Sequence, residues 1–316
     1  MKERLNYIDA IKGFAILLVV MGHVIAWQFG SFSDAQALGK PILLWNCIYA
    51  FHMPLFIFVS GLLFGYSSFP TTKSYVTKII SRFWRLIIPY FVCGFLVFLW
   101  RGGRPLTYWY LLTLFQLIVV MGVVYLIVDK IKNNKVRIIV ECITIVFLFL
   151  TLGFISKYCS YPWLTAYEWF PHLKQMFPYF VLGAFISRHT YINSLMNNHV
   201  FSFSLIFFIA AFFISIPYID RLQALAGIYC TFYLFMNCFT EGHAVDYLKR
   251  IGRMTLYIYI MHFFFDICIV QLGDYFIGLS QTGKMGYVTC FCFTIIICKC
   301  CLHRCYRIIL VCGKNY

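Results

Sequence analysis

Apolar residues along the chain gather into long, nearly uninterrupted runs separated by short polar segments. Most runs have about the twenty residues that a helix needs to cross roughly 30 Å of hydrocarbon. We therefore predict an all-α integral membrane protein, a bundle of about ten transmembrane helices. The predicted spans are Lys12–Phe29, Pro41–Tyr66, Trp84–Trp100, Thr107–Val128, Val136–Ile155, Leu173–Ile186, Val200–Ile216, Leu222–Thr240, Met254–Leu272 and Met285–Leu302. The sixth is the weakest, because it is short and contains Pro178, and hydropathy leaves nine or eleven spans open.

The distribution of positive charge gives this pattern an orientation. With the N-terminus placed in the cytoplasm, the inner segments hold 19 of the 26 Lys and Arg residues. Cytoplasmic loops of membrane proteins carry such an excess, so we expect both termini to be cytoplasmic. The net charge of +15 then reflects loops that face an anionic leaflet, and we expect no nucleic acid partner.

Composition agrees with a chain that has lipid as its solvent. Hydrophobic residues make up 62% of the chain and charged residues only 12%, whereas soluble domains carry about 25% charged residues. There is no linker or low-complexity tract, so we expect residues 1–316 to form a single transmembrane domain without an appended soluble domain.

Three histidines fall near the middle of the predicted bilayer, each on a different span. At 1.5 Å per residue, His23 and His52 lie about 16 Å into their helices and His262 about 13 Å. Ionisable side chains are costly in hydrocarbon and are functional candidates by default. The alternative for each is a hydrogen bond that holds two helices together.

Helical spacing connects these histidines to other charged residues. Lys12 and His23 are separated by three turns plus about 20°, so they share one face of the first span. Asp9, three residues before Lys12, is close enough to pair with it. Asp266 follows His262 by four residues and is placed to orient its imidazole. Catalytic candidates are therefore His23, Lys12, His52, His262 and Asp266.

A basic segment precedes and opens the third predicted span. Arg82 and Arg85 are three residues apart and lie on one helix face, with Lys78 before them. Guanidinium groups bind phosphates through two parallel hydrogen bonds, which suits a nucleotide-like ligand from the cytoplasm. The alternative is an anchor that contacts lipid headgroups.

Other polar positions carry weaker signals. Aromatic rings surround one acid at the outer rim, where Trp163, Glu168 and Trp169 would bind a sugar ring unless they form an interfacial aromatic belt. Glu141 lies near a helix end, and we expect its side chain to reach the membrane interface. The cysteine-rich run 298–305 lacks paired Cys-x-x-Cys motifs, so we expect no metal site.

Several blocks of the sequence resemble the acyltransferase-3 family of transmembrane acyltransferases. The N-terminal block reads Arg4-Leu-x-Tyr-Ile-Asp-Ala-Ile-Lys12-Gly-Phe-Ala-Ile-Leu-Leu-Val-Val-Met-Gly-His23. Further blocks are Phe51-His-Met-Pro-Leu-Phe-Ile-Phe-Val-Ser-Gly61, Arg82-x-x-Arg85-Leu-x-x-Pro89, Trp109-Tyr-Leu-Leu112, Phe177-Pro-Tyr-Phe-x-Leu-Gly183 and Gly252-x-x-Thr-Leu-Tyr-x-Tyr-x-x-His262. The resemblance runs through nearly the whole chain, and its first block is the most specific.

The resemblance implies a ten-helix bundle that transfers an acyl group, commonly acetyl from cytoplasmic acetyl-CoA, to a carbohydrate hydroxyl at the outer face of a bacterial inner membrane. It implies that the family's basic-residue-x10-His motif is Lys12 and His23, and that its Arg-x-x-Arg motif is Arg82 and Arg85. Many members have Arg where this chain has Lys12. Lys presents a point charge without a planar fork, so the positioning of a phosphate or thioester is expected to differ.

Two mechanisms and two other functional classes stay open at this point. His23 either deprotonates the acceptor hydroxyl or carries the acyl group itself, and a donor such as Ser60 stabilises the oxyanion. Midplane His and Asp residues also occur in proton-coupled transporters or flippases, although the two halves of the chain show no internal repeat. A non-catalytic partner in polysaccharide export is the third possibility.

Overall fold

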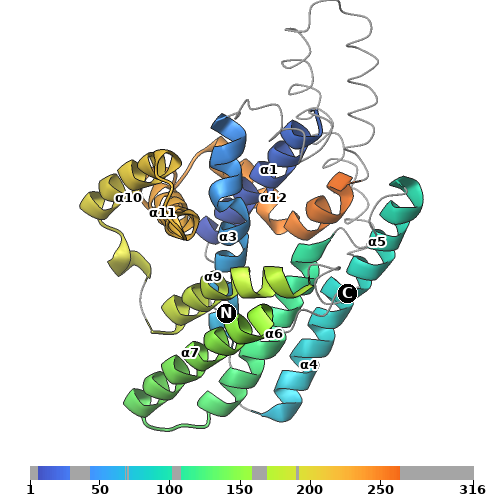
Figure 1. Ribbon diagram of the computed structural model, residues 1–316, viewed down its shortest axis with the longest axis vertical. Coiled ribbons are helices and arrows are strands. Elements are labelled where there is room, and N and C mark those ends of the chain that lie inside the picture. The colour runs from blue at the N-terminus through green and yellow to red at the C-terminus, as the bar shows by residue number, and fades with distance from the viewer. Residues whose placement is uncertain are drawn as a thin grey trace, which may run out of the picture. The chain divides into compact units, whose positions relative to one another are not determined.

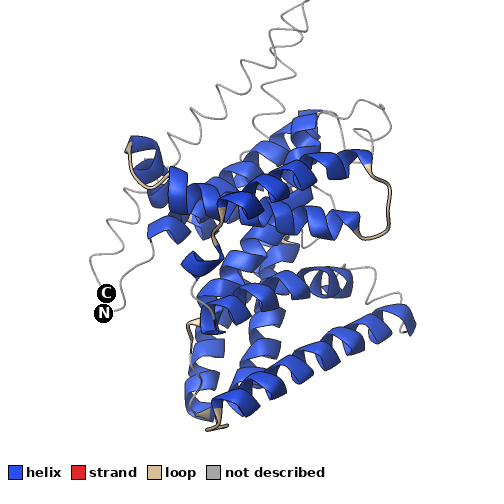
Figure 2. Cartoon of the chain, turned by 90° about the vertical axis from the view of Figure 1, so that its left-hand side faces the viewer, coloured by secondary structure: helices blue, strands red, loops and turns tan. Residues whose placement is uncertain are grey.

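The described part of the chain is entirely helical between its loops. The computed structural model describes residues 6–28, 43–67, 69, 71–101, 108–158, 169–189 and 192–263. No strand occurs in these ranges (Figure 2). The all-α prediction is thereby confirmed for this part of the chain. The predicted span at Met285–Leu302, and the residues after Phe263 in the one at Met254–Leu272, lie outside it.

Two compact units divide the chain. One contains Met1–Gly22 and Pro41–Ile260, and the other contains His23–Lys40 and Met261–Tyr316. Nearly all of the described helices belong to the first unit (Figure 1). They are α1 Asn6–Gln28, which continues into the second unit, α3 Leu43–Gly65, α4 Thr72–Arg82, α5 Ile88–Arg101, α6 Trp109–Val128, α7 Asn134–Tyr158, α9 Trp169–His189, α10 Asn198–Ala210, α11 Ile219–Tyr233 and α12 His243–Arg253.

Short π and 3-10 segments continue or connect these helices. The π segments are η1 Phe83–Ile87 and η4 Leu234–Cys238, and the 3-10 segments are η2 Ile192–Leu195 and η3 Ala211–Phe213. Segment η1 joins α4 to α5, so that residues 72–101 form one continuous helical rod. The membrane span predicted at Trp84–Trp100 is therefore part of a longer helix than hydropathy indicated.

Five helices in the described ranges are long and apolar enough to cross a membrane. They are Asn6–His23, Leu44–Gly65, Thr72–Leu99, Trp109–Val128 and Asn134–Ile155. A shorter apolar helix covers Asn198–Phe213. The other five predicted spans either are not long and apolar enough by this measure or lie partly or wholly outside the described residues. The count of ten spans and the cytoplasmic location of both termini therefore stay predictions.

Glycines let α3 and α9 approach until their backbones touch. A Cβ on Gly61 would lie 2.0 Å from the carbonyl oxygen of Phe180, and one on Gly183 would lie 2.2 Å from that of Phe58. Gly65, one turn after Gly61, meets the backbone of Ala184 in the same way. Small residues spaced four apart are the usual basis of close helix packing in membranes. Helix α9 runs through Pro178 and is longer than the span expected at Leu173–Ile186.

A second glycine contact joins α1 to α12. A Cβ on Gly252 would lie 1.8 Å from the carbonyl oxygen of Asp9, and one on Gly13 would lie 2.0 Å from that of Leu248. Helix α12 is amphipathic: it buries Val245 and Ile251, while Asp246 and Arg250 are exposed. The two helices therefore pack backbone to backbone where α1 carries Lys12.

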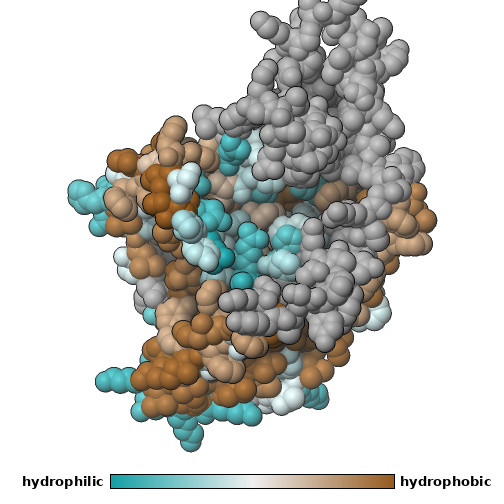
Figure 3. Space-filling model, in the orientation of Figure 1, coloured by the Kyte–Doolittle hydropathy of each residue, from teal (hydrophilic) through white to brown (hydrophobic). Residues whose placement is uncertain are grey.

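Helix α7 presents a broad apolar face to its surroundings. Ile143, Phe147, Leu150 and Phe154 are each more than 60% exposed. Figure 3 shows hydrophobic residues over the region that α7 occupies in Figure 1. Exposed large apolar side chains in such number mark a surface that is covered by hydrocarbon in a membrane protein.

The opposite face of α7 takes part in a buried charge network, which corrects our expectation for Glu141. Its side chain is fully buried, and its Oε2 lies 3.0 Å from His189 Nε2 and 3.8 Å from Arg188 Nε. Arg188 also donates to Asp129 Oδ1 at 2.5 Å, with its guanidinium 3.9 Å from the Tyr125 ring centroid. The network joins α6, α7 and α9, so Glu141 pairs inside the protein instead of reaching the interface.

Candidate active site

Six helical elements of the first unit, together with residues 255–259, line a cavity of about 200 Å³. Its charged wall carries Lys12 of α1, Arg82 of α4, Arg85 of η1 and Arg253 of α12. Its deeper wall carries hydroxyl and aromatic side chains from α3, α6 and residues 255–259. The structure therefore brings together three cations that the sequence predicted as ligand-binding residues and adds a fourth.

The cations in this cavity outnumber the acids. None of the lining residues is acidic. Asp9 lies beside the cavity, with Oδ1 3.6 Å from Lys12 Nζ and Oδ2 3.9 Å from Arg253 Nε. Among the residues that the structure describes, the cavity lining therefore holds four cations and no acid, an arrangement that favours a multiply charged anion.

Proline explains the local backbone around Arg85. Pro89 has no N–H to donate to the Arg85 carbonyl, and its ring would clash with that carbonyl in a regular α-helix. The chain widens by one residue instead, and the Ile88 N–H bonds to the Phe83 carbonyl. Such π turns often occur at functional sites. Here the widened turn carries Arg85 and the buried Leu86 into the cavity wall.

Hydroxyl groups converge in the deeper wall. Ser60 Oγ lies 3.2 Å from Tyr110 Oη, and the Tyr110 and Tyr259 rings pack edge to face at 5.2 Å. Both tyrosines are buried, and the Thr255 hydroxyl donates to the Gly252 carbonyl at 2.5 Å. Ser60, predicted as a hydrogen-bond donor, thus lies in the cavity that the basic residues line.

The second unit brings two of the predicted histidines together. His23 Nδ1 and His262 Nε2 are 2.9 Å apart, a hydrogen bond in which one ring nitrogen donates and the other accepts. The ring of Phe263 lies 5.4 Å from His23 and 4.1 Å from His262. Each imidazole therefore restricts the orientation and the tautomer of the other.

His52 has a different environment, in the first unit. Its side chain is buried, and Nδ1 lies 2.7 Å from the Ile48 carbonyl of the preceding turn. Because a carbonyl oxygen only accepts, Nδ1 carries the proton. The ring also contacts Tyr49 edge to face at 4.8 Å. This hydrogen bond lies within α3 and joins no second helix, so it differs from the contact between helices that was the structural alternative for this histidine.

Comparison with known families identifies the family of the chain. A sequence model of the acyltransferase-3 family, described as an acyltransferase domain, matches residues 5–303. The chain belongs to the acyltransferase-3 family. No curated protein and no solved structure matches it. This match confirms the resemblance inferred from the sequence motifs. Together with the apolar helices, family membership identifies the protein as an integral membrane protein.

The remaining predicted residues of this acyltransferase-3 member lie apart from the cavity or outside the described residues. Lys78 is not part of the cavity lining, and its ammonium group lies 4.6 Å from the Phe69 ring centroid. Trp163, Glu168 and Asp266 are outside the described residues. Trp169 begins α9, but its side chain is also outside the described part. The cysteine-rich run 298–305 falls there too. Roles for all of these stay predictions.

Sequence reasoning missed Arg253 as a member of the cavity. It was counted only among the cytoplasmic positive charges, because it lies outside the Arg-x-x-Arg motif. The signal that would have found it is Gly252, whose missing side chain allows α12 to touch α1 next to Asp9 and Lys12. Arg253 follows that contact directly, which places it beside the same carboxylate.

Proposed function

We propose that this protein transfers an acyl group, most simply acetyl, from cytoplasmic acetyl-CoA to a hydroxyl of an extracytoplasmic or lipid-linked carbohydrate. The observation that carries the proposal is the cavity lined by Lys12, Arg82, Arg85 and Arg253. Membership of the acyltransferase-3 family supports acyl transfer. The cavity supports a donor that carries several phosphate groups.

The basic cavity suits the phosphate-bearing part of the donor. At about 200 Å³ it is smaller than the 300–1,000 Å³ of cavities that enclose a whole drug-sized ligand. We therefore assign it only a part of acyl-CoA. Arg82 and Arg85 offer planar guanidinium groups for bidentate contacts, and Lys12 offers a mobile point charge. Asp9 holds Lys12 and Arg253 on one side of the cavity.

His23 is the proposed catalytic residue. As general base it takes the proton of the acceptor hydroxyl while that oxygen attacks the thioester carbonyl, and it then returns the proton to the departing thiolate. As nucleophile it displaces the CoA thiolate from the thioester and forms a transient acyl-imidazole. The acceptor hydroxyl then attacks this acyl group and releases His23, and its proton passes to the thiolate. The hydrogen bond to His262 serves both routes, because it fixes which nitrogen of His23 holds a proton.

The membrane location supports a carbohydrate acceptor that is lipid-linked or lies outside the cytoplasm. A donor in the cytoplasm and an acceptor beyond the bilayer need a reactive group inside the bundle, and α1 carries both Lys12 and His23. We propose O-acetylation of a surface polysaccharide or its lipid-linked precursor in a bacterial inner membrane. The predicted sugar-binding residues at the outer rim are Trp163, Glu168 and Trp169.

The experiment uses purified full-length protein in vesicles with labelled acetyl-CoA and a polysaccharide acceptor. We expect release of CoA and labelled carbohydrate from the wild type. His23→Ala should lose at least roughly a hundredfold in transfer, the usual contribution of a positioned acid–base group. His243→Ala is the matched control, because His243 is an exposed residue at the start of α12.

The outcomes separate the proposal from its rivals. Full transfer by a correctly inserted His23→Ala protein would overturn the catalytic role. A transporter or flippase would move carbohydrate across the vesicle without releasing CoA. A structural partner in polysaccharide export would show neither activity, and every histidine substitution would be silent.

A further inference from the structure

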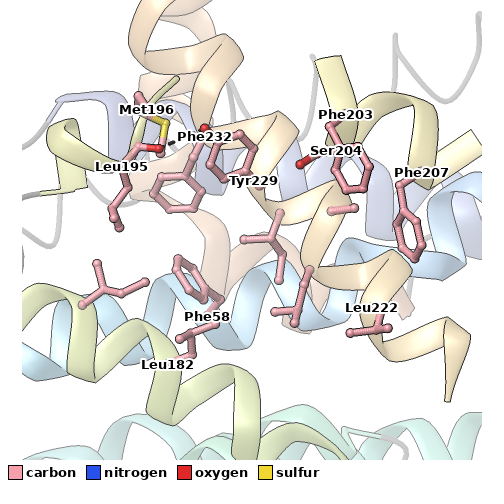
Figure 4. Close-up of a pocket in the computed structure, with 14 residues that line it drawn as sticks. Phe58, Leu182, Leu195, Met196, Phe203, Ser204, Phe207, Leu222, Tyr229 and Phe232 are labelled. Carbon is pink, nitrogen blue, oxygen red and sulfur yellow. Dashed lines mark hydrogen bonds between the residues drawn. The ribbon is translucent and has the colours of Figure 1, made fainter. Parts of the chain in front are cut away.

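A second cavity of about 480 Å³ lies on another side of α3, between α9, η2, α10 and α11 (Figure 4). Phe58 and Leu182 face across it toward Tyr229 and Phe232, and α10 closes one side with Phe203 and Phe207. Of the fourteen residues drawn in Figure 4, only Ser204 and Tyr229 have polar side chains. A wall this apolar offers too few polar partners for the phosphates of an acyl donor or the hydroxyls of a sugar.

The polar atom of Tyr229 is already bonded within the protein. Its hydroxyl accepts from the Asn197 N–H at 2.9 Å and donates to the Leu195 carbonyl at 2.9 Å, the bond drawn in Figure 4. A polar ligand would therefore bury its own groups against hydrocarbon, which costs several kcal/mol for each unpaired group. The cavity selects an apolar ligand.

The rim of this cavity opens to the surroundings of the protein. Phe203 is 71% exposed and Leu222 54% exposed, although both also line the cavity. The exposed apolar surface continues along α10 through Ile206 and Ile209. In an integral membrane protein the medium at such a surface is the hydrocarbon of the bilayer, so lipid chains have direct access to the cavity.

One end of the cavity is polar. Asn197, Asn198 and His199 are exposed, and they follow Leu195 and Met196 of the cavity wall directly. Tyr233 bonds to the Asn198 side chain at the same end. An apolar cavity that ends at exposed amide and imidazole groups matches a molecule with a hydrocarbon chain and a polar head.

We propose that this cavity binds one acyl chain of a membrane phospholipid, with the headgroup at Asn197–His199. The bound chain supports α3 from the side opposite the basic cavity. Phe58 lines the phospholipid cavity, whereas Phe56 and Ser60 line the basic one. Positions two residues apart lie about 200° apart around a helix, so the two cavities occupy opposite faces of α3.

The test is photolabelling of the full-length protein in phosphatidylcholine vesicles. A small fraction of the lipid carries a diazirine on one acyl chain, and labelled residues are mapped by mass spectrometry after irradiation. We expect labelling of Phe207 and Phe232, which are less exposed, to exceed that of the lipid-facing Phe147 and Leu150 on α7.

Two variants fill the cavity from different helices, and one matched variant does not. Ser204→Trp on α10 and Ala226→Phe on α11 should each lower cavity labelling by roughly tenfold, equivalent to about 1.4 kcal/mol. Ser202→Trp makes the same change at an exposed position on α10 outside the lining, and should leave the labelling unchanged. Either filling variant that folds is sufficient for the comparison.

Three results would overturn the proposal. Cavity labelling that does not exceed that of α7 would mean that another segment of the chain or a partner fills the space. Labelling that both filling variants leave intact would place the lipid elsewhere. Complete displacement of the label by an equimolar polyprenyl phosphate would identify an isoprenoid chain as the occupant instead. None of these results depends on acyl transfer, so the proposed function is tested separately.

Discussion

Arg253 gives the basic cavity its fourth cation, and its contribution to donor binding is measurable. Charged hydrogen bonds contribute about 1.5–3 kcal/mol, and the side chain is 51% exposed, so the lower end applies. Arg253→Ala should raise the KM for acetyl-CoA by roughly tenfold with little change in kcat. Arg250→Ala, an exposed change on the same helix outside the cavity lining, should leave KM unchanged. Equal effects of both variants would assign Arg253 to the membrane interface.

We propose that His262 positions His23, because the two imidazoles are hydrogen-bonded to each other. His262→Ala removes the partner that fixes the tautomer of His23, so kcat should fall by roughly tenfold to a hundredfold while KM for acetyl-CoA stays the same. Met261→Ala is the adjacent control. A change in KM alone would contradict the positioning role.

At the scale of single residues, the sequence predicted which residues take part in the candidate site better than it predicted which of them contact one another. Lys12, Arg82 and Arg85 were recognised from motif spacing, and the structure places them around one cavity. Hydropathy placed three histidines at similar depth, but depth carries no information on partners. The structure pairs His23 with His262, and it bonds His52 to a carbonyl of its own helix.

At the scale of elements, the contact between α3 and α9 depends on the absence of side chains. Gly61→Leu would place atoms where the Phe180 carbonyl lies, and overpacking of this kind costs about 1–3 kcal/mol. We expect a lower thermal midpoint of the purified protein in detergent. Gly153→Leu makes the same change on α7, where nothing lies within 4 Å, and should have little effect. Equal stability of the two variants would contradict the close approach of α3 and α9.

A second prediction at this scale concerns the contribution of the charge network of α6, α7 and α9 to stability. Arg188→Leu leaves Asp129 and Glu141 without their shared cation, and an uncompensated buried charge costs about 3–5 kcal/mol. Thermal unfolding in detergent should show this loss. Asp246→Asn breaks a surface pair with Lys249 and should cost under about 1 kcal/mol. A second change, Glu141→Leu, should restore part of the stability lost in Arg188→Leu.

The elements themselves were predictable where hydrophobicity alone determines them. The spans predicted at 12–29, 41–66, 107–128 and 136–155 correspond to α1, α3, α6 and α7 within a few residues, apart from an earlier start of α1. Helices α4 and α12 were missed, because both are amphipathic and rich in Lys and Arg, so their mean hydropathy is low. Helix α9 extends beyond the predicted span at both ends, where Pro171, His172, Arg188 and His189 lower the hydropathy.

At the scale of the whole molecule, the distribution of charge predicts that both termini are cytoplasmic. A fluorescent protein fused to either end of the full chain should fluoresce, whereas alkaline phosphatase at the same ends should be inactive. The reason is that 19 of 26 basic residues then fall on the inner side. Active phosphatase at the C-terminus would require an odd number of spans.

The contact between α1 and α12 also limits how this protein can diversify. A Cβ added to Gly13 would lie 2.0 Å from the carbonyl oxygen of Leu248, and one added to Gly252 would lie 1.8 Å from that of Asp9. Both distances are far shorter than van der Waals contact. A saturation library that is scored by the amount of folded protein should therefore accept many residues at Arg253 and almost none at its neighbour Gly252. Engineering of donor preference can change the residues of the charged wall, at the cost of donor affinity, but it has to keep both glycines.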